Sequence, residues 1–155
     1  MRLFVNKIIT SGLFVIVVLL NIACAEKKSA NAPELKLSEY LETFRVFTTE
    51  SGLQYRVLVK GDGLKPVLTD TVVVHYVGKK IDGTEFDSSI RRGEPATYPI
   101  FILIDGWKEA LLLMNVGSKY RLVIPPELAY GEKGAGTVIG PNEIVIFEVE
   151  LLEIL

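Results

Sequence analysis

The side chains that most often carry out covalent or metal chemistry are scarce in this chain. Its 155 residues include one cysteine, Cys24, and one histidine, His75. A single cysteine forms neither a disulfide within the chain nor a cysteine-based metal site. His75 alternates with Tyr76 in a strand-like run and is expected on the outward, solvated face. We therefore expect no metal, no cofactor and a mechanism without a nucleophile–base pair.

Three further functional classes also find little support. A serine hydrolase built on His75 would need a G-x-S-x-G motif, which the sequence does not contain. The glycines between 131 and 136 neither follow a strand nor open a helix, so they are not a nucleotide-binding loop. The formal net charge is −2, without a basic stripe, which argues against nucleic acid as a partner.

The most informative segment is 104–117, which we predict to hold one short helix around Trp107. Asp105 or Gly106 is expected to cap its start, and 115–117 to end it. The run 110–114 is entirely apolar, so the helix must be buried on most sides. Trp107, with Leu103 and Ile104 before it, is predicted to form the base of an apolar pocket that carries the function.

The segments that must surround this helix all have strand patterns. Strands are predicted at 53–59, 72–77, 119–124 and 143–151, with a hairpin at Asp82-Gly83 joining 80–81 to 84–86. The residues 87–89 are expected in a polar loop, and 128–142 in a glycine-rich loop. About five antiparallel strands around one helix make an α+β domain.

The N-terminus has the layout of a signal peptide rather than of a folded element. Arg2 and Lys7 precede an uninterrupted apolar run at 13–20, and Ala23-Cys24-Ala25 follows. Two processing routes stay open: lipidation of Cys24, which is favoured although Asn21 is unusual three residues before it, or cleavage after Ala25. An uncleaved anchor is disfavoured because the run is shorter than the ~20 residues of a membrane span.

These patterns divide the chain into three parts. Residues 1–23 are predicted to be a lipoprotein-type signal peptide, and 49–155 the folded domain. The segment 24–48 between them is expected to be a tether, and the near-helical apolar spacing at 34–47 is compatible with either a short lead helix or an irregular segment.

Five motifs in fixed order then resemble one known family, the FKBP-type peptidyl-prolyl cis-trans isomerases. The resemblance covers about 49–155 and rests on Val74-His75-Tyr76-Val77-Gly78, Asp82-Gly83-Thr84-Glu85-Phe86-Asp87-Ser88-Ser89, Ile104-Asp105-Gly106-Trp107, Ala129-Tyr130-Gly131 and Phe147-Glu148-Val149-Glu150-Leu151-Leu152. It implies an antiparallel half-barrel sheet of five to six strands wrapped around one short helix. It also implies rotation of X-Pro bonds in exported proteins as the activity.

The resemblance further implies the residues of the site. Taken singly, each of these side chains is as typical of core packing as of function. The implied catalytic group is Asp87, Tyr130, Phe86 and Trp107, and the implied substrate-binding group is Tyr76, Leu103, Ile104, Ile139 and Phe147. Two residues differ from the usual family sequence. Ala96 occupies a position where the family usually has an aromatic residue, and Ala135 occupies one where histidine is common.

The implied partners are proline-containing polypeptides, macrolides of the tacrolimus and rapamycin type, and a membrane reached through a lipid on Cys24. The implied location is the bacterial cell envelope, facing the periplasm. One alternative uses the same pocket: a peptide-binding chaperone module with little or no turnover.

Overall fold

The computed structural model describes residues 44–155. The predicted signal peptide, Cys24 and most of the predicted lead helix lie outside the described residues. Within the described part of the chain, no helix is long and apolar enough to cross a membrane.

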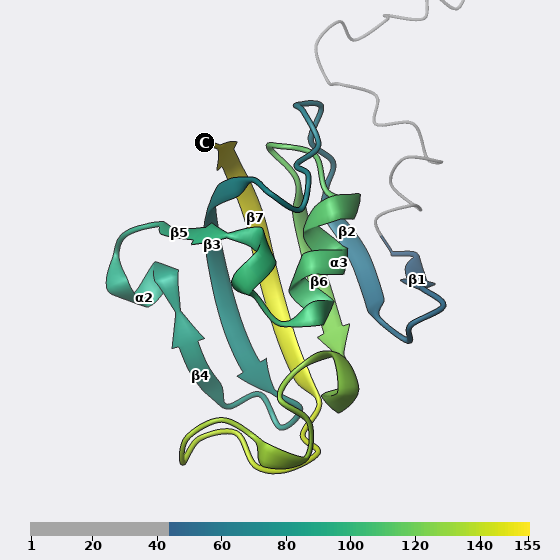
Figure 1. Ribbon diagram of the computed structural model, residues 1–155, viewed down its shortest axis with the longest axis vertical. Helices are drawn as coiled ribbons and strands as arrows, with labels where there is room; N and C mark the ends of the chain where they lie inside the picture. Colours follow the sequence, from purple (N-terminus) through teal and green to yellow (C-terminus); the bar gives the residue numbers. More distant parts are fainter. Residues whose placement is uncertain (1–43) are drawn as a thin grey trace, which may run out of the picture. The chain divides into compact units, whose positions relative to one another are not determined.

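Within residues 44–155, seven antiparallel strands form one sheet. Their order is β1-β2-β6-β7-β3-β4, and β5 pairs with the first half of β3. The sheet is an open layer with a short helix over one face (Figure 1). The strands are β1 (Val46–Thr48), β2 (Gln54–Val59), β3 (Thr71–Lys80), β4 (Glu85–Ser88), β5 (Ala96–Pro99), β6 (Lys119–Ile124) and β7 (Val145–Ile154).

The long strands bury one face by simple alternation, as their sequences predict. Along β3 the residues Val72, Val74 and Tyr76 are buried, and the residues between them are half-buried. The inward residues of β6 and β7 follow the same rule. The core therefore lies between this face and the main helix.

The main helix is α3 (Asp105–Leu113), and a single turn of helix, α2 (Ser89–Arg92), follows β4. Three short 3₁₀ turns span Ile100–Ile102, Pro126–Leu128 and Gly131–Lys133. Leu111 of α3 is 1% exposed, whereas Leu112 beside it is 38% exposed. One side of the helix thus packs into the core and the other reaches the surface.

The helix does not begin as predicted. Ile104 is its N-cap and makes no side-chain capping bond, so the prediction of a cap at Asp105 or Gly106 was wrong. Asp105 is the first helical residue, and its carboxylate instead accepts a hydrogen bond of 3.0 Å from Lys108. Close packing explains Gly106, because a Cβ there would lie 2.4 Å from Cγ2 of Ile124.

Two further predictions need correction at the strands. The lead helix does not continue to Phe47, because Val46–Thr48 is a strand paired with β2 and the Phe47 ring stacks on Tyr55 at 5.1 Å. The sheet thus begins three residues before the predicted domain boundary at 49. The predicted loop 87–89 is also partly wrong, because β4 continues to Ser88 and Ser89 opens α2.

Candidate functional site

A cavity of about 260 Å³ opens on the concave side of the sheet beside the N-terminal turn of α3. All but one of the site residues expected from the sequence line it. The lining residues are Tyr76, Phe86, Asp87, Tyr98, Ile102, Leu103, Ile104, Trp107, Tyr130 and Phe147. The exception is Ile139, which is 5% exposed and packs in the core without lining the cavity. Tyr98 and Ile102 also line the cavity, although they were not expected from the sequence.

Aromatic rings in edge-to-face contact make the wall of this pocket. The Trp107 ring meets Tyr76 at 5.3 Å and Phe147 at 5.2 Å between centroids, each nearly perpendicular. Phe86 meets Phe147 at 5.5 Å in the same way. Edge-to-face contact is a preferred geometry for aromatic pairs, because the positive ring edge meets the negative face. The rings therefore hold one another in place before any ligand arrives.

A local irregularity lets two neighbouring residues of β4 share the pocket. Adjacent strand residues normally point to opposite faces, yet both Phe86 and Asp87 line the cavity. The register between β3 and β4 shifts between Gly78 and Lys79, which marks a bulge. Bulges twist a strand and turn a side chain toward a site, which accounts for this placement.

Gly78 is the residue that permits the two phenylalanine rings to meet. A Cβ at this position would lie 2.7 Å from Phe147 and 2.8 Å from Phe86. We predict that Gly78→Ala lowers the free energy of unfolding by about 1–3 kcal/mol through overpacking. It should also weaken binding of a prolyl peptide, because the displaced rings form the wall. Urea denaturation and peptide titration measure the two effects.

Gly140→Ala is the matched control for this prediction. Its Cβ would meet only the movable end of Glu143, at 3.3 Å. It should change the unfolding free energy less than Gly78→Ala and leave peptide binding unaltered. Equal effects of the two substitutions would contradict the packing role of Gly78.

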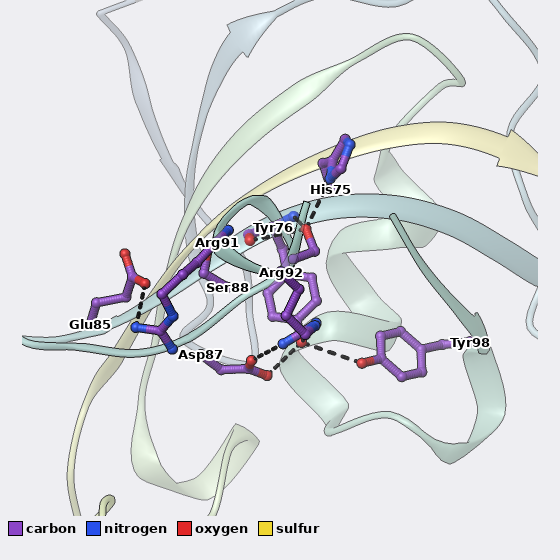
Figure 2. A network of polar contacts seen from close by, with 9 residues as sticks. His75, Tyr76, Glu85, Asp87, Ser88, Arg91, Arg92 and Tyr98 are labelled. Atoms are coloured by element: carbon purple, nitrogen blue, oxygen red, sulfur yellow. Dashed lines mark hydrogen bonds and ion pairs between the residues drawn. The ribbon is translucent and has the colours of Figure 1, made fainter. Parts of the chain in front are cut away.

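The polar side of the pocket is a network around the Tyr76 hydroxyl (Figure 2). This hydroxyl donates a 2.5 Å hydrogen bond to Oδ2 of Asp87 and lies 3.3 Å from the hydroxyl of Tyr98. Arg92 donates to it at 3.0 Å and also forms an ion pair with Oδ1 of Asp87. The carboxylate is thus held at the pocket edge from two sides.

Arg92 was not proposed from the sequence, and helix α2 is what brings it to Asp87. Ser88 caps this helix by accepting a 3.1 Å hydrogen bond from the backbone N–H of Arg91. Gly93 ends it with φ 82°, a conformation that glycine adopts without strain. A single turn between these signals carries Arg92 back over the Tyr76 ring, at 5.5 Å from its centroid. The Ser-x-x-x-x-Gly spacing is the signal that could have identified it.

These contacts shift the protonation of the network. Burial alone would raise the pKa of Asp87, but hydrogen bonds from Tyr76 and Arg92 outweigh it and lower the pKa below 3.8. Burial, together with the bond to Asp87, raises the pKa of Tyr76 above its ordinary value of 10.0. At neutral pH the site therefore holds an ionised Asp87 and a protonated Tyr76.

This shift predicts how stability depends on pH. Because folding lowers the pKa of Asp87, its contribution is fully present above about pH 5 and is lost as the pH falls below 3.8. The side chain of Asp87 is 43% exposed, so we expect a contribution of less than ~1 kcal/mol. The difference in unfolding free energy between the wild type and Asp87→Asn should be constant from pH 7 to about pH 5 and then shrink. A difference that grows in acid would contradict the assignment.

The backbone of Tyr76 is fixed from behind by a buried serine. The Ser89 hydroxyl accepts a 2.7 Å hydrogen bond from the N–H of Tyr76 and donates to its carbonyl at 3.3 Å. It also lies 3.0 Å from Nδ1 of His75. Figure 2 shows the His75 ring on the opposite side of β3 from the Tyr76 ring. His75 is thus on the outward face as predicted, but half-buried and hydrogen-bonded rather than simply solvated.

Two donors of the pocket have no partner among residues 44–155. The backbone N–H of Ile104 makes no hydrogen bond there, although its carbonyl accepts from Trp107 and Lys108. The Tyr130 hydroxyl lines the cavity without a hydrogen-bond partner in the same range. Burial raises the pKa of Tyr130, so its hydroxyl keeps its proton. Both groups are therefore available to a ligand carbonyl.

Neither alanine that departs from the family pattern lines the pocket. Ala96 begins β5 opposite Val74, and Ala135 pairs with Ile139 in the loop before β7. In the described part of the chain, no group of three or more His, Cys, Asp or Glu side chains is placed to hold a metal ion.

The fold is an open antiparallel sheet over one short helix, and the aromatic pocket lies at the start of that helix. Together these features are those of one protein family, which the comparison of the sequence identifies. Residues 63–152 match the model of the FKBP-type peptidyl-prolyl cis-trans isomerase family. This match covers more than half of the 155 residues, and the chain belongs to that family.

Individual relatives are similar over the same region. The FKBP-type 22 kDa peptidyl-prolyl cis-trans isomerase of Escherichia coli is 60% identical over 119 residues, which are 77% of this chain and 58% of that protein. The peptidyl-prolyl cis-trans isomerase Mip of Coxiella burnetii is 52% identical over 109 residues, 70% of this chain and 47% of its own length. The chain thus spans about half the length of these curated relatives.

Solved structures agree with the fold. The crystal structure of FkpA from Escherichia coli matches with a TM-score of 0.69 and 46% identity, covering 76% of this chain and 56% of that one. A peptidyl-prolyl cis-trans isomerase from Pseudomonas syringae matches with a TM-score of 0.67 and 38% identity, covering 74% of this chain and 86% of that one.

Proposed function

We propose that this chain is a peptidyl-prolyl cis-trans isomerase that accelerates rotation of X-Pro bonds in exported polypeptides. The observation that carries the proposal is the aromatic pocket beside Trp107, with a fixed carboxylate at one edge and two unpaired donors within it. Membership in a family of this activity supports it.

The energetic problem is amide resonance. The barrier to rotation about an X-Pro bond is ~18–20 kcal/mol, and uncatalysed exchange takes ~10–100 s at 25 °C. A twisted amide has lost resonance and is less dipolar than a planar amide. Moving it from water into a dry pocket therefore costs less free energy than moving the planar amide there. Binding that is tighter for the twisted state than for the planar state lowers the barrier. No covalent intermediate is required.

Each group of the site has a separate role in the proposed catalysis. The rings of Trp107, Phe86 and Phe147 hold the prolyl ring and exclude water. The Ile104 N–H binds a carbonyl of the substrate backbone, and the Tyr130 hydroxyl donates to a second one. Asp87 supplies a fixed negative charge at the pocket edge, where it orients the Tyr76 hydroxyl. Such preorganised groups act without reorganising during the rotation.

Exposed apolar side chains at the pocket favour a second candidate, a peptide-binding chaperone module with little turnover. Ile102 lines the pocket and is 61% exposed, and Phe101 beside it is 59% exposed. Such a surface binds unfolded chains through apolar contact alone.

Refolding of a protein whose slow phase is limited by X-Pro isomerisation separates the two candidates. An isomerase increases the rate of the slow phase at catalytic concentration, and a tacrolimus-type macrolide that fills the pocket abolishes the increase. A chaperone module raises the refolded yield and leaves the rate unchanged, which would overturn the isomerase proposal.

We further propose that the chain is attached by a lipid on Cys24 to a membrane of the bacterial envelope, facing the periplasm. The signal-peptide pattern supports this location. A relative that is 48% identical over 104 residues is named outer membrane protein MIP of Legionella longbeachae. The test is metabolic labelling with a radioactive fatty acid: the wild type should be labelled and Cys24→Ser should not. An unlabelled wild type beginning at Glu26 would establish cleavage after Ala25 instead.

A further inference from the structure

A second cavity, of about 300 Å³, lies at the end of the sheet where the turn from β3 to β4 meets the start of β7. It is lined by Lys80, Ile81, Asp82, Asn142, Glu143 and Ile144. Figure 1 shows both segments at the same end of the sheet, and the pairing of Lys80 with Val145 joins them. None of these residues takes part in the pocket beside Trp107.

The two cavities share the strand β3. Tyr76 lines the first cavity, Gly78 underlies the rings that form its wall, and Lys80 lines the second. Alternate residues of a strand point to the same side at 3.2–3.4 Å per residue, so Tyr76 and Lys80 are roughly 13 Å apart along it. An extended polypeptide covers this distance with about four residues. One substrate chain can therefore reach both cavities.

The second cavity combines aliphatic walls with carboxylates. Ile81 is 69% exposed and Ile144 is 40% exposed, and both lie open to a ligand. The carboxylates of Asp82 and Glu143 outnumber the single ammonium of Lys80. Lys80 forms an ion pair with Glu143 at 3.3 Å from both carboxylate oxygens, and among residues 44–155 the buried Oε2 of Glu143 has no hydrogen bond in addition to this ion pair. A long apolar stem with a cationic end complements this lining.

The walls are held in place before a ligand arrives. Oδ1 of Asp82 accepts a 2.8 Å hydrogen bond from the N–H of Thr84, and Lys80 donates its own N–H to the carbonyl of Thr84 at 2.8 Å. This backbone bond at Asp82 is also the main cause that lowers its pKa, so the carboxylate stays ionised. Asn142 is fixed by a 2.9 Å bond from its N–H to the carbonyl of Gly131.

We propose that this second cavity binds a lysine or arginine side chain of the same polypeptide whose prolyl residue occupies the first pocket, about four residues away. The proposal rests on the isomerase function proposed above and adds a sequence preference to it. The aliphatic stem lies between Ile81 and Ile144, and the cationic group contacts Asp82 with support from Glu143.

Peptides of matched length test the preference with the full-length chain. A parent X-Pro peptide without charge is compared with peptides that carry lysine, norleucine or glutamate four residues before or after the proline. On one of the two sides, kcat/KM should be about 2- to 5-fold higher for lysine than for norleucine, as one exposed charge contact provides. The advantage should largely disappear in 0.5 M salt, because the main carboxylate, Asp82, is exposed to solvent.

Isosteric variants locate the preference. Asp82→Asn keeps an oxygen for the Thr84 N–H and should remove most of the lysine advantage, and Glu143→Gln should reduce it. Glu153→Gln, an exposed residue near the other end of β7, should retain it. All three variants should isomerise the parent peptide at the wild-type rate. Equal rates for lysine and norleucine, or a preference for glutamate, would overturn the proposal.

A binding measurement separates this proposal from the isomerase function. Amide NMR signals of Ile81 and Ile144 should shift further on titration with the lysine peptide than with the norleucine peptide at equal concentration. If the parent peptide is not isomerised but these shifts occur, the isomerase function fails and the cationic site stands. If the parent peptide is isomerised and the shifts are absent, only the second site fails.

Discussion

Asp87→Ala is expected to lower kcat/KM for a short X-Pro peptide by about 10- to 100-fold while leaving the fold intact. Hydrogen bonds to a charged group contribute roughly 1.5–3 kcal/mol, and each 1.36 kcal/mol is a factor of ten in rate. The carboxylate fixes the Tyr76 hydroxyl at 2.5 Å and pairs with Arg92 at the pocket edge. Its side chain is 43% exposed, so its removal leaves no cavity in the core.

Glu85→Ala is the matched control for this result. Glu85 lies two residues away on the same strand, pairs with Arg91 at 2.9 Å, and does not line the pocket. It should retain wild-type activity, and both variants should keep the circular dichroism spectrum of the wild type. Activity of Asp87→Ala equal to that of Glu85→Ala would remove the carboxylate from the mechanism.

Leu111→Ala is expected to lower the free energy of unfolding by about 2–5 kcal/mol, the range for a buried leucine whose removal leaves a cavity. Leu111 is 1% exposed and lies on the helix face that packs into the core. An isolated helix of nine residues is unstable in water, so this packing is what holds α3 in place. Urea denaturation monitored by Trp107 fluorescence measures the loss.

Leu112→Ala provides the comparison, because Leu112 is the next residue of the same helix and the same residue type but is 38% exposed. We expect a change below about 1 kcal/mol, as for most surface substitutions. Losses of similar size in the two variants would mean that the helix is not buried on one side, contrary to the fold described above.

The parts of the fold that follow a simple period could be predicted. Strict alternation identified β3, β6 and β7, and Asp82-Gly83 identified the hairpin, where Gly83 has φ 89°. The short strands β1 and β5 were missed because three or four residues are too few to show a period. In addition, β5 pairs with β3, from which β4 and α2 separate it in the chain, and local sequence does not encode such a pairing.

The site was predicted from motifs, and its omissions have a physical cause. The family motifs contain Trp107 and Asp87, so both were proposed for the site. Arg92 lies outside these motifs and reaches Asp87 only because the turn of α2 folds it back. The resemblance also implied Ile139 at the pocket, because a motif says nothing of which way a side chain points. Ile139 is 5% exposed and packs in the core instead.

The most direct test of the proposed function is NMR exchange spectroscopy on a short peptide with one X-Pro bond, in the presence of the full-length chain. If the chain is an isomerase, substoichiometric protein should shorten the time of cis–trans exchange below the ~10–100 s of the uncatalysed reaction. The peptide should also change the NMR chemical shifts of the Ile104 and Trp107 amides. A macrolide that fills the pocket should return the exchange to its uncatalysed rate. A peptide that shifts the same amides while its exchange rate stays unchanged would contradict catalysis and leave a binding module on this fold.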